Sequence, residues 1–449
     1  MPLSWLLSTL ASAALLPTVP LQESVPEEDE VLWIHAKRLV LRPGAVVEGG
    51  ALLVRGGIIV AVGEDVVAPE GARKLEGEVA CAGFVDGWSS LALDPASATD
   101  LGTAAATRTV DALDPFRLPY QREEALQGGV TSQRVQVGRM AQFGGVGTVL
   151  RTDPERAEVL LEDACVSATI GITRGGRAGD VFDRVGEVDR LVSQIEKGRT
   201  YRESEIEYRH ELEAWEKAIA EKRKELDEEF KKAKKKREKG MEEAEEKGKE
   251  FKEERYKEDK KPRKPRWDPS TEVLARVANG ELPLVVEVHG VPELRSLLEK
   301  TAGFDRLRLV LAGCTDAVHV AEEIAERRIP VLLWPTAEPG DGGEYERHDL
   351  ALAGALERAG VEVLFGSGGR ALARDLRLLA AQAVGHGLDR EAALHALTLG
   401  PARAFDVADR VGTLERGKHA DVLLFDGDPL GTNSRIRTVI SRGRVVVEQ

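Results

Sequence analysis

Residues 282–313, LPLVVEVHGVPELRSLLEKTAGFDRLRLVLAG, set the class of fold for the central part of the chain. Two short apolar runs, at 282–288 and 307–313, flank a segment at 291–302 in which apolar residues recur at helical spacing. A strand, a helix and a second strand in this order are typical of a parallel βα unit. Because both runs are almost continuously apolar, we expect strands that are buried on both faces.

The same alternation continues on both sides of this unit. Further strands are predicted at 81–89, 129–138, 329–335 and 361–368, and further helices at 316–328, 350–360, 374–387 and 389–405. The pattern predicts an α/β fold with a TIM-like (β/α)8 barrel over residues 83–408. Without the insertion described below, roughly 255 residues remain for it, near the ~250 residues typical of such barrels.

The two ends of the chain have a different texture. Residues 31–82 and 409–449 contain short runs of Val, Ile and Leu separated by glycine-containing turns, which predicts β-strands. Either set alone would leave exposed sheet edges. We therefore predict one small β-sandwich that is made from both chain ends.

A charged insertion at residues 197–266 interrupts the barrel pattern. Its apolar residues follow three-four spacing, which predicts a long helix with one narrow apolar stripe. The stripe consists of Tyr208, Leu212, Trp215, Ile219, Leu226, Phe230 and Ala233, and Gly240 is expected to break the helix into two arms. The helix is either a coiled-coil-like arm that binds a protein partner or a second copy of the chain, or a solvated excursion with many ion pairs.

Composition limits the partners and the location of the protein. The net charge of −14 over 449 residues argues against a general nucleic-acid binder. Residues 1–22 are similar to a signal peptide, which predicts a periplasmic or extracellular protein, with the cytoplasm as the alternative. No other apolar run approaches the ~20 residues that span a bilayer, so no membrane span is expected after removal of the leader. Cys81, Cys165 and Cys314 are too few and too scattered for a disulfide framework.

Several stretches resemble the amidohydrolase superfamily, in particular its imidazolonepropionase-like and prolidase-like members. The motifs are GGIIVAVGE at 56–64, CAGFVDG at 81–87, ALQGGVTSQRV at 125–135, FGGVGTVLRT at 143–152, LPLVVEVHG at 282–290, AEEIAERRIPVLLWP at 321–335 and, as the most specific, the segment 392–430. The resemblance implies a metal-dependent barrel with a small β-sandwich. It also implies hydrolysis of a non-peptide carbon–nitrogen bond, in an amide or a cyclic amide, by a metal-bound water.

The metal ligands that this resemblance implies are mostly missing. Family members place a His-x-His pair on the first barrel strand, often a carboxylated lysine, two further histidines and an aspartate. The corresponding positions in this chain are Trp88, Ser90, His289, Ala312 and Gly368, and no lysine occurs between Lys74 and Lys197. A single imidazole does not make a tight zinc site, because catalytic zinc usually has three protein ligands.

Two other groups of residues are candidate sites. The first could bind a metal near the barrel mouth and consists of Glu287, His289, Cys314, Asp316 and His319. In the alternative interpretation, Glu287 and His289 form a polar pair, Asp316 caps a helix and His319 faces solvent. The second group is the glycine-rich turn Gly366, Ser367, Gly368 and Gly369, whose backbone N–H groups could bind an anion.

Together these patterns favour a degenerate or inactive amidohydrolase, a pseudoenzyme that acts as a binding or scaffold protein and needs no cofactor. A small-molecule ligand could bind in the barrel mouth. One alternative is an active hydrolase with zinc or another divalent metal in a rebuilt site around His289. The other is an interaction protein that works through the helical arm.

Overall fold

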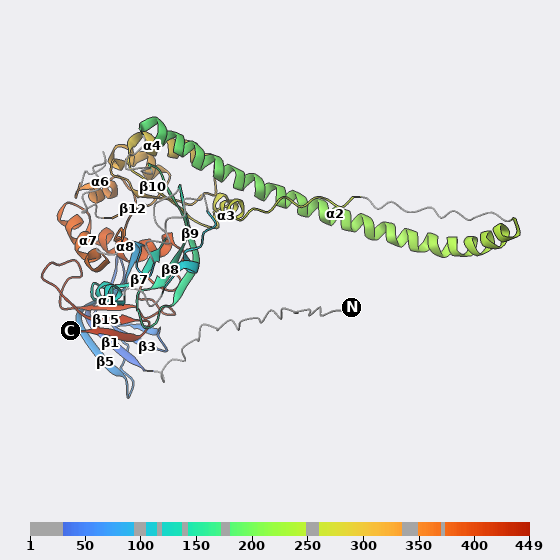
Figure 1. Cartoon of the computed structure of the whole chain (residues 1–449). Helices are drawn as coiled ribbons and strands as arrows, with labels where there is room; N and C mark the ends of the chain where they lie inside the picture. Colours follow the sequence, from blue (N-terminus) through green and yellow to red (C-terminus); the bar gives the residue numbers. More distant parts are fainter. Residues whose placement is uncertain are drawn as a thin grey trace, which may run out of the picture.

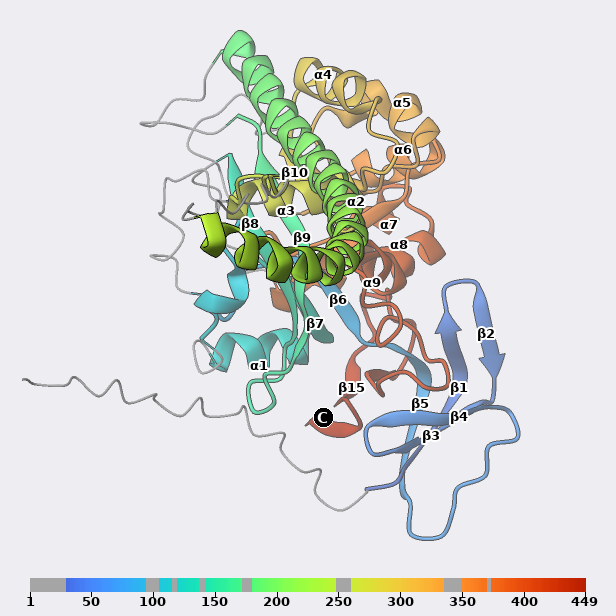
Figure 2. The ribbon, with the colours of Figure 1, turned by 90° about the vertical axis from the view of Figure 1, so that its right-hand side faces the viewer.

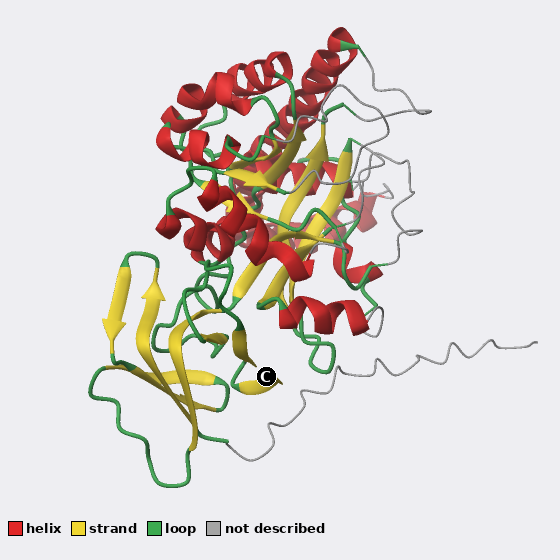
Figure 3. Cartoon of the chain, turned by 90° about the vertical axis from the view of Figure 1, so that its left-hand side faces the viewer, coloured by secondary structure: helices red, strands yellow, loops and turns green. Residues whose placement is uncertain are grey.

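The computed structural model describes residues 30–93, 105–114, 119–136, 142–171, 180–247, 260–334, 349–369 and 373–449. Two sheets organise these residues, a curled sheet built from both chain ends and a barrel surrounded by helices (Figures 1 and 3). The predicted leader, residues 1–22, lies outside the described residues. All three cysteines are buried and unpaired, as the sequence predicts.

Both chain ends contribute strands to one sheet, which has the order β16-β15-β14-β5-β1-β3-β4 with β2 paired to β1. Its strands are β1 (Leu32–Arg42), β2 (Ala45–Glu48), β3 (Ala51–Arg55), β4 (Ile58–Gly63), β5 (Arg73–Ala82), β14 (Val422–Phe425), β15 (Ile436–Ser441) and β16 (Arg444–Glu448). The junction is the antiparallel pair β5–β14, in which Val422 faces Ala82. The N-terminal strands therefore depend on residues more than three hundred positions later in the chain.

This end sheet, as we call it below, curls until two of its turns meet. A Cβ atom on Gly57 would lie 2.6 Å from the Arg442 carbonyl oxygen, and one on Gly443 would lie 2.6 Å from the Gly57 Cα. Both glycines also have positive φ, so the close approach of the β3–β4 and β15–β16 turns requires glycine twice. The predicted sandwich is seen here as one continuous sheet that curls over its own apolar core.

The second sheet is a nearly closed barrel of eight strands in the order β13 to β6. The strands are β6 (Phe84–Ser89), β7 (Val130–Val135), β8 (Phe143–Arg151), β9 (Val159–Thr169), β10 (Leu284–Val288), β11 (Leu309–Gly313), β12 (Val331–Leu333) and β13 (Val363–Phe365). The end strands β13 and β6 are in contact, which brings the two edges of the sheet together.

One strand departs from the predicted parallel barrel. Strand β8 runs antiparallel to both of its neighbours, β7 and β9. The segments before and after β8 are short, and a parallel crossover needs about a dozen or more residues. The chain therefore turns back twice as hairpins in this region, and no helix separates these three strands among the described residues.

Helices cover the outside of the barrel (Figure 3). They are α1 (Pro119–Gln127), α2 (Val181–Lys247), α3 (Pro269–Ala278), α4 (Val291–Thr301), α5 (Ala321–Glu326), α6 (Leu352–Arg358), α7 (Leu376–Gly385), α8 (Arg390–Leu397) and α9 (Leu399–Ala404), with short 3-10 helices η2 (Thr109–Ala112), η3 (Ala317–Val320) and η4 (Ala373–Asp375). Alternate side chains of strand β10 contribute to two separate hydrophobic clusters, one between the barrel and its helices and one inside the barrel. Leu284, Val286 and Val288 pack with the helices, whereas Val285 belongs to a separate cluster together with Trp88 and Phe405.

Residues 197–247 of the predicted charged insertion belong to helix α2, which spans 67 residues. The helix begins at Val181, before the predicted insertion, and buries Val188, Leu191 and Ile195 in the barrel core, beside α3 and α4 (Figure 2). The rest runs away from the barrel (Figure 1). The expected break at Gly240 is wrong, because a single glycine costs a helix only about 1 kcal/mol.

The described part of the predicted stripe is only partly covered. Tyr208, Leu212 and Trp215 are half-buried, and Ile219 is buried. The Lys261 ammonium lies 5.8 Å from the centre of the Trp215 ring, so the returning chain passes beside the helix here. Leu226, Phe230 and Ala233 lie outside the described side chains.

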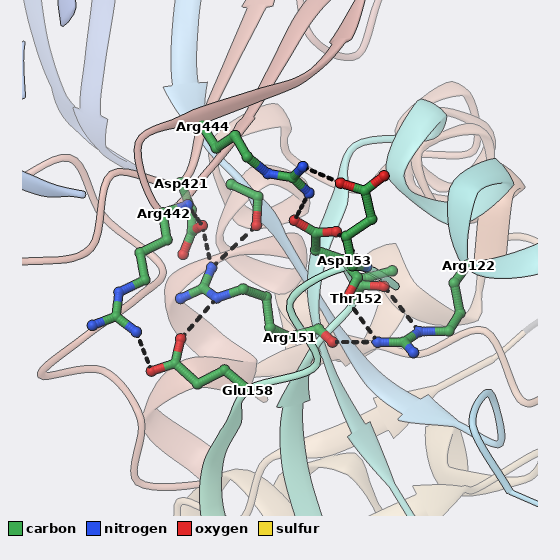
Figure 4. Close-up of polar contacts among 10 residues, drawn as sticks. Arg122, Arg151, Thr152, Asp153, Glu158, Asp421, Arg442 and Arg444 are labelled. Atoms are coloured by element: carbon green, nitrogen blue, oxygen red, sulfur yellow. Dashed lines mark hydrogen bonds and ion pairs between the residues drawn. The ribbon is translucent and has the colours of Figure 1, made fainter. Parts of the chain in front are cut away.

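Arginines form ion pairs that link the end sheet to the end of the barrel opposite its mouth (Figure 4). Arg151, the last residue of β8, is only 1% exposed and forms ion pairs with Asp421 and Glu158. Its third contact is with His419, where Arg151 Nη2 lies 2.8 Å from Nδ1. Because Arg151 pairs with Ser132 near the start of β7, this junction lies at the end of the barrel opposite the mouth.

Two further arginines complete the junction. Arg122 is fully buried and donates hydrogen bonds to the backbone carbonyls of Arg151, Thr152 and Asp153. Burial, partly offset by Asp153, lowers the pKa of Arg122 to about 10. Arg444, from β16, pairs with Asp153 and Glu155. The bottom of the barrel is thus held by charged contacts to both the strand ends and the end sheet.

The two halves of α2 make a matched test of what the helix contributes. Leu191→Ala should lower the free energy of unfolding by about 2–5 kcal/mol, because it opens a cavity in the barrel core. Leu212→Ala should cost about 1 kcal/mol or less, because its side chain is already half exposed. Urea denaturation of both variants measures the difference. Equal losses would show that the outer half of α2 is an integral part of the core.

Candidate functional site

The positions that correspond to the family's metal ligands lie at one end of the barrel. Trp88 lies near the end of strand β6, and Ala312 lies near the end of β11. His289 directly follows β10, and Gly368 follows β13. These are the carboxyl ends of parallel strands, where barrel proteins place their active sites. The fold therefore gathers the predicted positions, although most of them carry no metal-binding side chain.

Trp88 packs into the barrel mouth. The residue is 5% exposed, and its ring packs against the Trp334 ring with 4.7 Å between ring centroids and 39° between the ring planes. The edge of Trp334 in turn meets the His289 ring at 6.4 Å. An aromatic row therefore extends across the mouth from β6 past β12 to β10.

Glycines make room for this row. A Cβ atom on Gly366 would lie 2.7 Å from the Trp88 Cβ, and one on Gly368 would lie 2.7 Å from the Trp334 Cδ1. Residue 368, the position of the family's aspartate, therefore has no space for a side chain while Trp334 keeps this place. The sequence analysis did not single out Trp334. Its place two residues after the inward-facing Leu332 was the available signal.

A buried cation lies below the row. Arg134, on β7, is fully buried, with its guanidinium carbon 5.1 Å from the Trp88 ring centre and 4.8 Å from that of Phe405. It donates to the Gly87 carbonyl at 2.8 Å, and it also contacts Gln136 and Cys165. Cation–π contacts of this kind gain strength when they are desolvated. The barrel interior thus already holds a permanent positive charge beside the first-strand position.

Asp86 joins the first strand to the last. Its Oδ1 accepts hydrogen bonds from the backbone N–H groups of Trp88 at 2.9 Å and Ser367 at 2.8 Å. The Gly368 N–H donates to the Trp88 carbonyl at 3.0 Å. The Gly366 N–H donates to the Leu333 carbonyl at 2.9 Å, so three N–H groups of the turn that was predicted to bind an anion are engaged inside the barrel. Burial raises the pKa of Asp86 to about 6, although its hydrogen bonds oppose the shift.

His289 is held between two polar side chains. Its Nδ1 lies 2.8 Å from Thr315 Oγ1, and its Nε2 lies 3.5 Å from Glu287 Oε1. Glu287 is nearly fully buried, whereas the His289 side chain is 19% exposed. The predicted polar pair of Glu287 and His289 is present, and Thr315 is a third member that the sequence analysis did not identify.

The other members of the predicted metal cluster are arranged differently. Cys314 is fully buried, and burial raises the pKa of its thiol. Asp316 is half-buried and His319 is exposed on η3. Across the described ranges, no three His, Cys, Asp or Glu side chains form a group that could hold a metal ion.

Comparisons with known proteins agree with this geometry. The model of the amidohydrolase family matches residues 289–446. The structure of an amidohydrolase from Thermotoga maritima MSB8 is similar, with a TM-score of 0.68 and 22% identity over 93% of this chain and 100% of that chain. The chain therefore matches the amidohydrolase family over residues 289–446 and shares its fold with this amidohydrolase structure.

Two further amidohydrolase-like structures share the fold at lower identity. Molinate hydrolase has a TM-score of 0.51 and 16% identity over 93% of this chain and 95% of its own. A prolidase complexed with N-methylphosphonate-L-proline has a TM-score of 0.51 and 14% identity over 93% and 100%. No curated protein matches the sequence of this chain. Within the described residues, no helix has the length and apolar character needed to cross a membrane.

The residues at these positions do not fit the divalent metal that amidohydrolases typically use. Among Trp88, Ser90, His289, Ala312 and Gly368, only His289 has a side chain suited to bind zinc. Trp334 packs beside that imidazole, and Trp88 packs against Trp334. We therefore derive no chemical step through a metal.

The Asp86 carboxyl gives a pH test of the seam between the first and last strands. A raised folded pKa means that the stabilising effect is complete below the unfolded value of 3.8 and is lost as pH rises through about 6. Between about pH 4 and pH 7 the wild type should lose roughly 2 kcal/mol relative to Asp86→Asn, which cannot ionise. Urea unfolding at each pH measures this difference. Parallel stability curves for the two proteins would contradict it, and the exposed Asp305→Asn serves as the control.

Proposed function

We propose that this protein is an amidohydrolase that has lost the metal-dependent reaction of its superfamily and acts as a binding or scaffold protein. The observation that carries the proposal is the tilted, closely packed pair Trp88–Trp334, which lies at the strand ends where the family ligands would stand. A tryptophan supplies no ligand for a divalent cation. It is also much larger than the histidine that the family has at this position.

Electrostatics supports the same conclusion. A divalent cation held by one imidazole would remain badly under-coordinated, and a buried charge without partners is costly. The Arg134 guanidinium, 5.1 Å from the Trp88 ring centre, adds a like charge on the inner side of the row. The mouth is therefore suited to a neutral or anionic small molecule rather than to a metal ion.

The surface and the leader suggest where and how the protein works. The outer half of α2 extends from the barrel (Figure 1) and offers a surface for a protein partner or for a second copy of the chain. We further propose export to the periplasm or the extracellular space, on the basis of the signal-like sequence at residues 1–22.

Metal analysis of the purified protein tests the proposal. Elemental analysis should find well under one zinc, manganese or iron per chain, and the protein should not hydrolyse dipeptides, hydantoins or imidazolones. Addition of a chelator should leave the melting temperature unchanged, because a metal bound only to the folded state would raise it by mass action.

The opposite result is equally clear. About one tightly held metal per chain, lost together with hydrolytic activity in His289→Ala, would establish the rebuilt metal site instead. His395→Ala is the matched control, since His395 also pairs with a glutamate, Glu362, at 2.7 Å but lies outside the barrel mouth.

A further inference from the structure

Three side chains at the barrel mouth form a chain of polar contacts. Thr315 Oγ1 lies 2.8 Å from His289 Nδ1, and His289 Nε2 lies 3.5 Å from Glu287 Oε1. The three come from the end of β10 and from the turn that follows β11. A hydroxyl next to an imidazole, with a carboxylate on the other ring nitrogen, is the arrangement that activates a hydroxyl nucleophile.

The Glu287 carboxylate determines which nitrogen of the His289 ring carries the proton. Glu287 favours the tautomer with a proton on Nε2, so that Nδ1 carries the lone pair that can accept the Thr315 hydroxyl proton. The ring is also held in place. A Cβ atom on Gly313 would lie 2.5 Å from the His289 Cε1, and the edge of Trp334 packs on the same imidazole.

The two residues before Thr315 have positive φ angles. They are Gly313, with a φ of 78°, and Cys314, with a φ of 49°. Non-glycine residues rarely adopt such values, and they cluster at functional sites. The turn buries the Cys314 side chain and leaves Thr315 half-buried beside His289. The hydroxyl, rather than the thiol, is therefore the group that faces the imidazole.

We propose that Thr315 and His289 form a metal-free acyl-transfer site for small carboxylic esters, with Glu287 as a positioning residue. Thr315 Oγ1 bonds to the ester carbonyl carbon while its proton passes to His289 Nδ1. The bond from that carbon to the alcohol oxygen then breaks, and the alcohol leaves with the proton from His289. Water next attacks the acyl-threonine and gives a proton to His289, and the carboxylic acid leaves as this proton returns to Thr315 Oγ1.

A hydrogen-bond donor for the developing oxyanion lies at the same residue. Within the part of the chain that the structure describes, no protein group accepts a hydrogen bond from the Thr315 backbone N–H. The N–H of a nucleophile is a common oxyanion donor in acyl transfer. This chemistry goes beyond the proposed function, because it needs none of the missing metal ligands.

Covalent labelling in the presence of a chelator tests the site. A fluorophosphonate should add once per chain, and mass spectrometry should find the adduct on Thr315. Labelling should fall about 100-fold in Thr315→Val and in His289→Ala, as expected for loss of a nucleophile or a general base. Thr315→Ser, which keeps the hydroxyl, and His395→Ala, which removes the imidazole of a His–Glu pair elsewhere, should label within about tenfold of wild type.

Ester hydrolysis separates the role of Glu287 from a merely structural one. With p-nitrophenyl acetate, Glu287→Gln should lower kcat about tenfold and leave KM unchanged, and Glu287→Asp should recover part of the loss. Melting curves establish that each variant is folded, and Thr315→Ala replaces Thr315→Val if the valine variant does not fold.

Three outcomes would overturn the proposal. They are a folded wild type that takes no label, labelling that persists in Thr315→Val, and ester hydrolysis that requires added zinc and stops with chelator. The first two would leave the proposed function intact, because metal content is measured separately. Only the third would count against both.

Discussion

The seam between the first and last barrel strands is the constraint on which the mouth depends. Strands β6 and β13 end the barrel sheet, so no ladder of strand pairing joins them. Asp86 and Trp88 supply the connection instead, through hydrogen bonds to the backbone of Ser367 and Gly368. The same contacts hold Trp88 against Trp334. The interactions that close the barrel therefore also place the side chains that fill its mouth.

The opposite end of the barrel is stabilised by charge rather than by aromatic packing. Arg151 and Arg122 hold the end of β8 and its following turn, and Arg151 also pairs with Asp421 of the end sheet (Figure 4). Because this junction is built from contacts that are remote from the mouth, the two-sheet architecture does not depend on which side chains stand at the mouth. Stability and chemistry lie at different ends of the barrel, as is usual for this fold.

The sequence predicted the architecture better than the details of the site. Apolar runs alternating with helical segments were sufficient for the barrel, and glycine-separated β-runs at both ends were sufficient for the end sheet. Apolar periodicity did not predict the strands β8 and β9, and it does not reveal that β8 is antiparallel to both of its neighbours. It also does not show where a helix leaves a core, and α2 therefore begins earlier than the charged composition suggested. Thr315 was missed because its contact with His289 joins the ends of two strands, which no local pattern encodes. The alternation from Leu332, by contrast, could have pointed to Trp334.

The central claim is that Trp88 and Trp334 exclude a metal from the mouth. Anomalous diffraction at the zinc absorption edge, from crystals grown with zinc in excess, tests it most directly. The account predicts no zinc peak at bonding distance from His289, and Trp88 and Trp334 rings that remain packed against each other. A zinc ion bound to His289, with Trp88 turned out of the mouth, would contradict it.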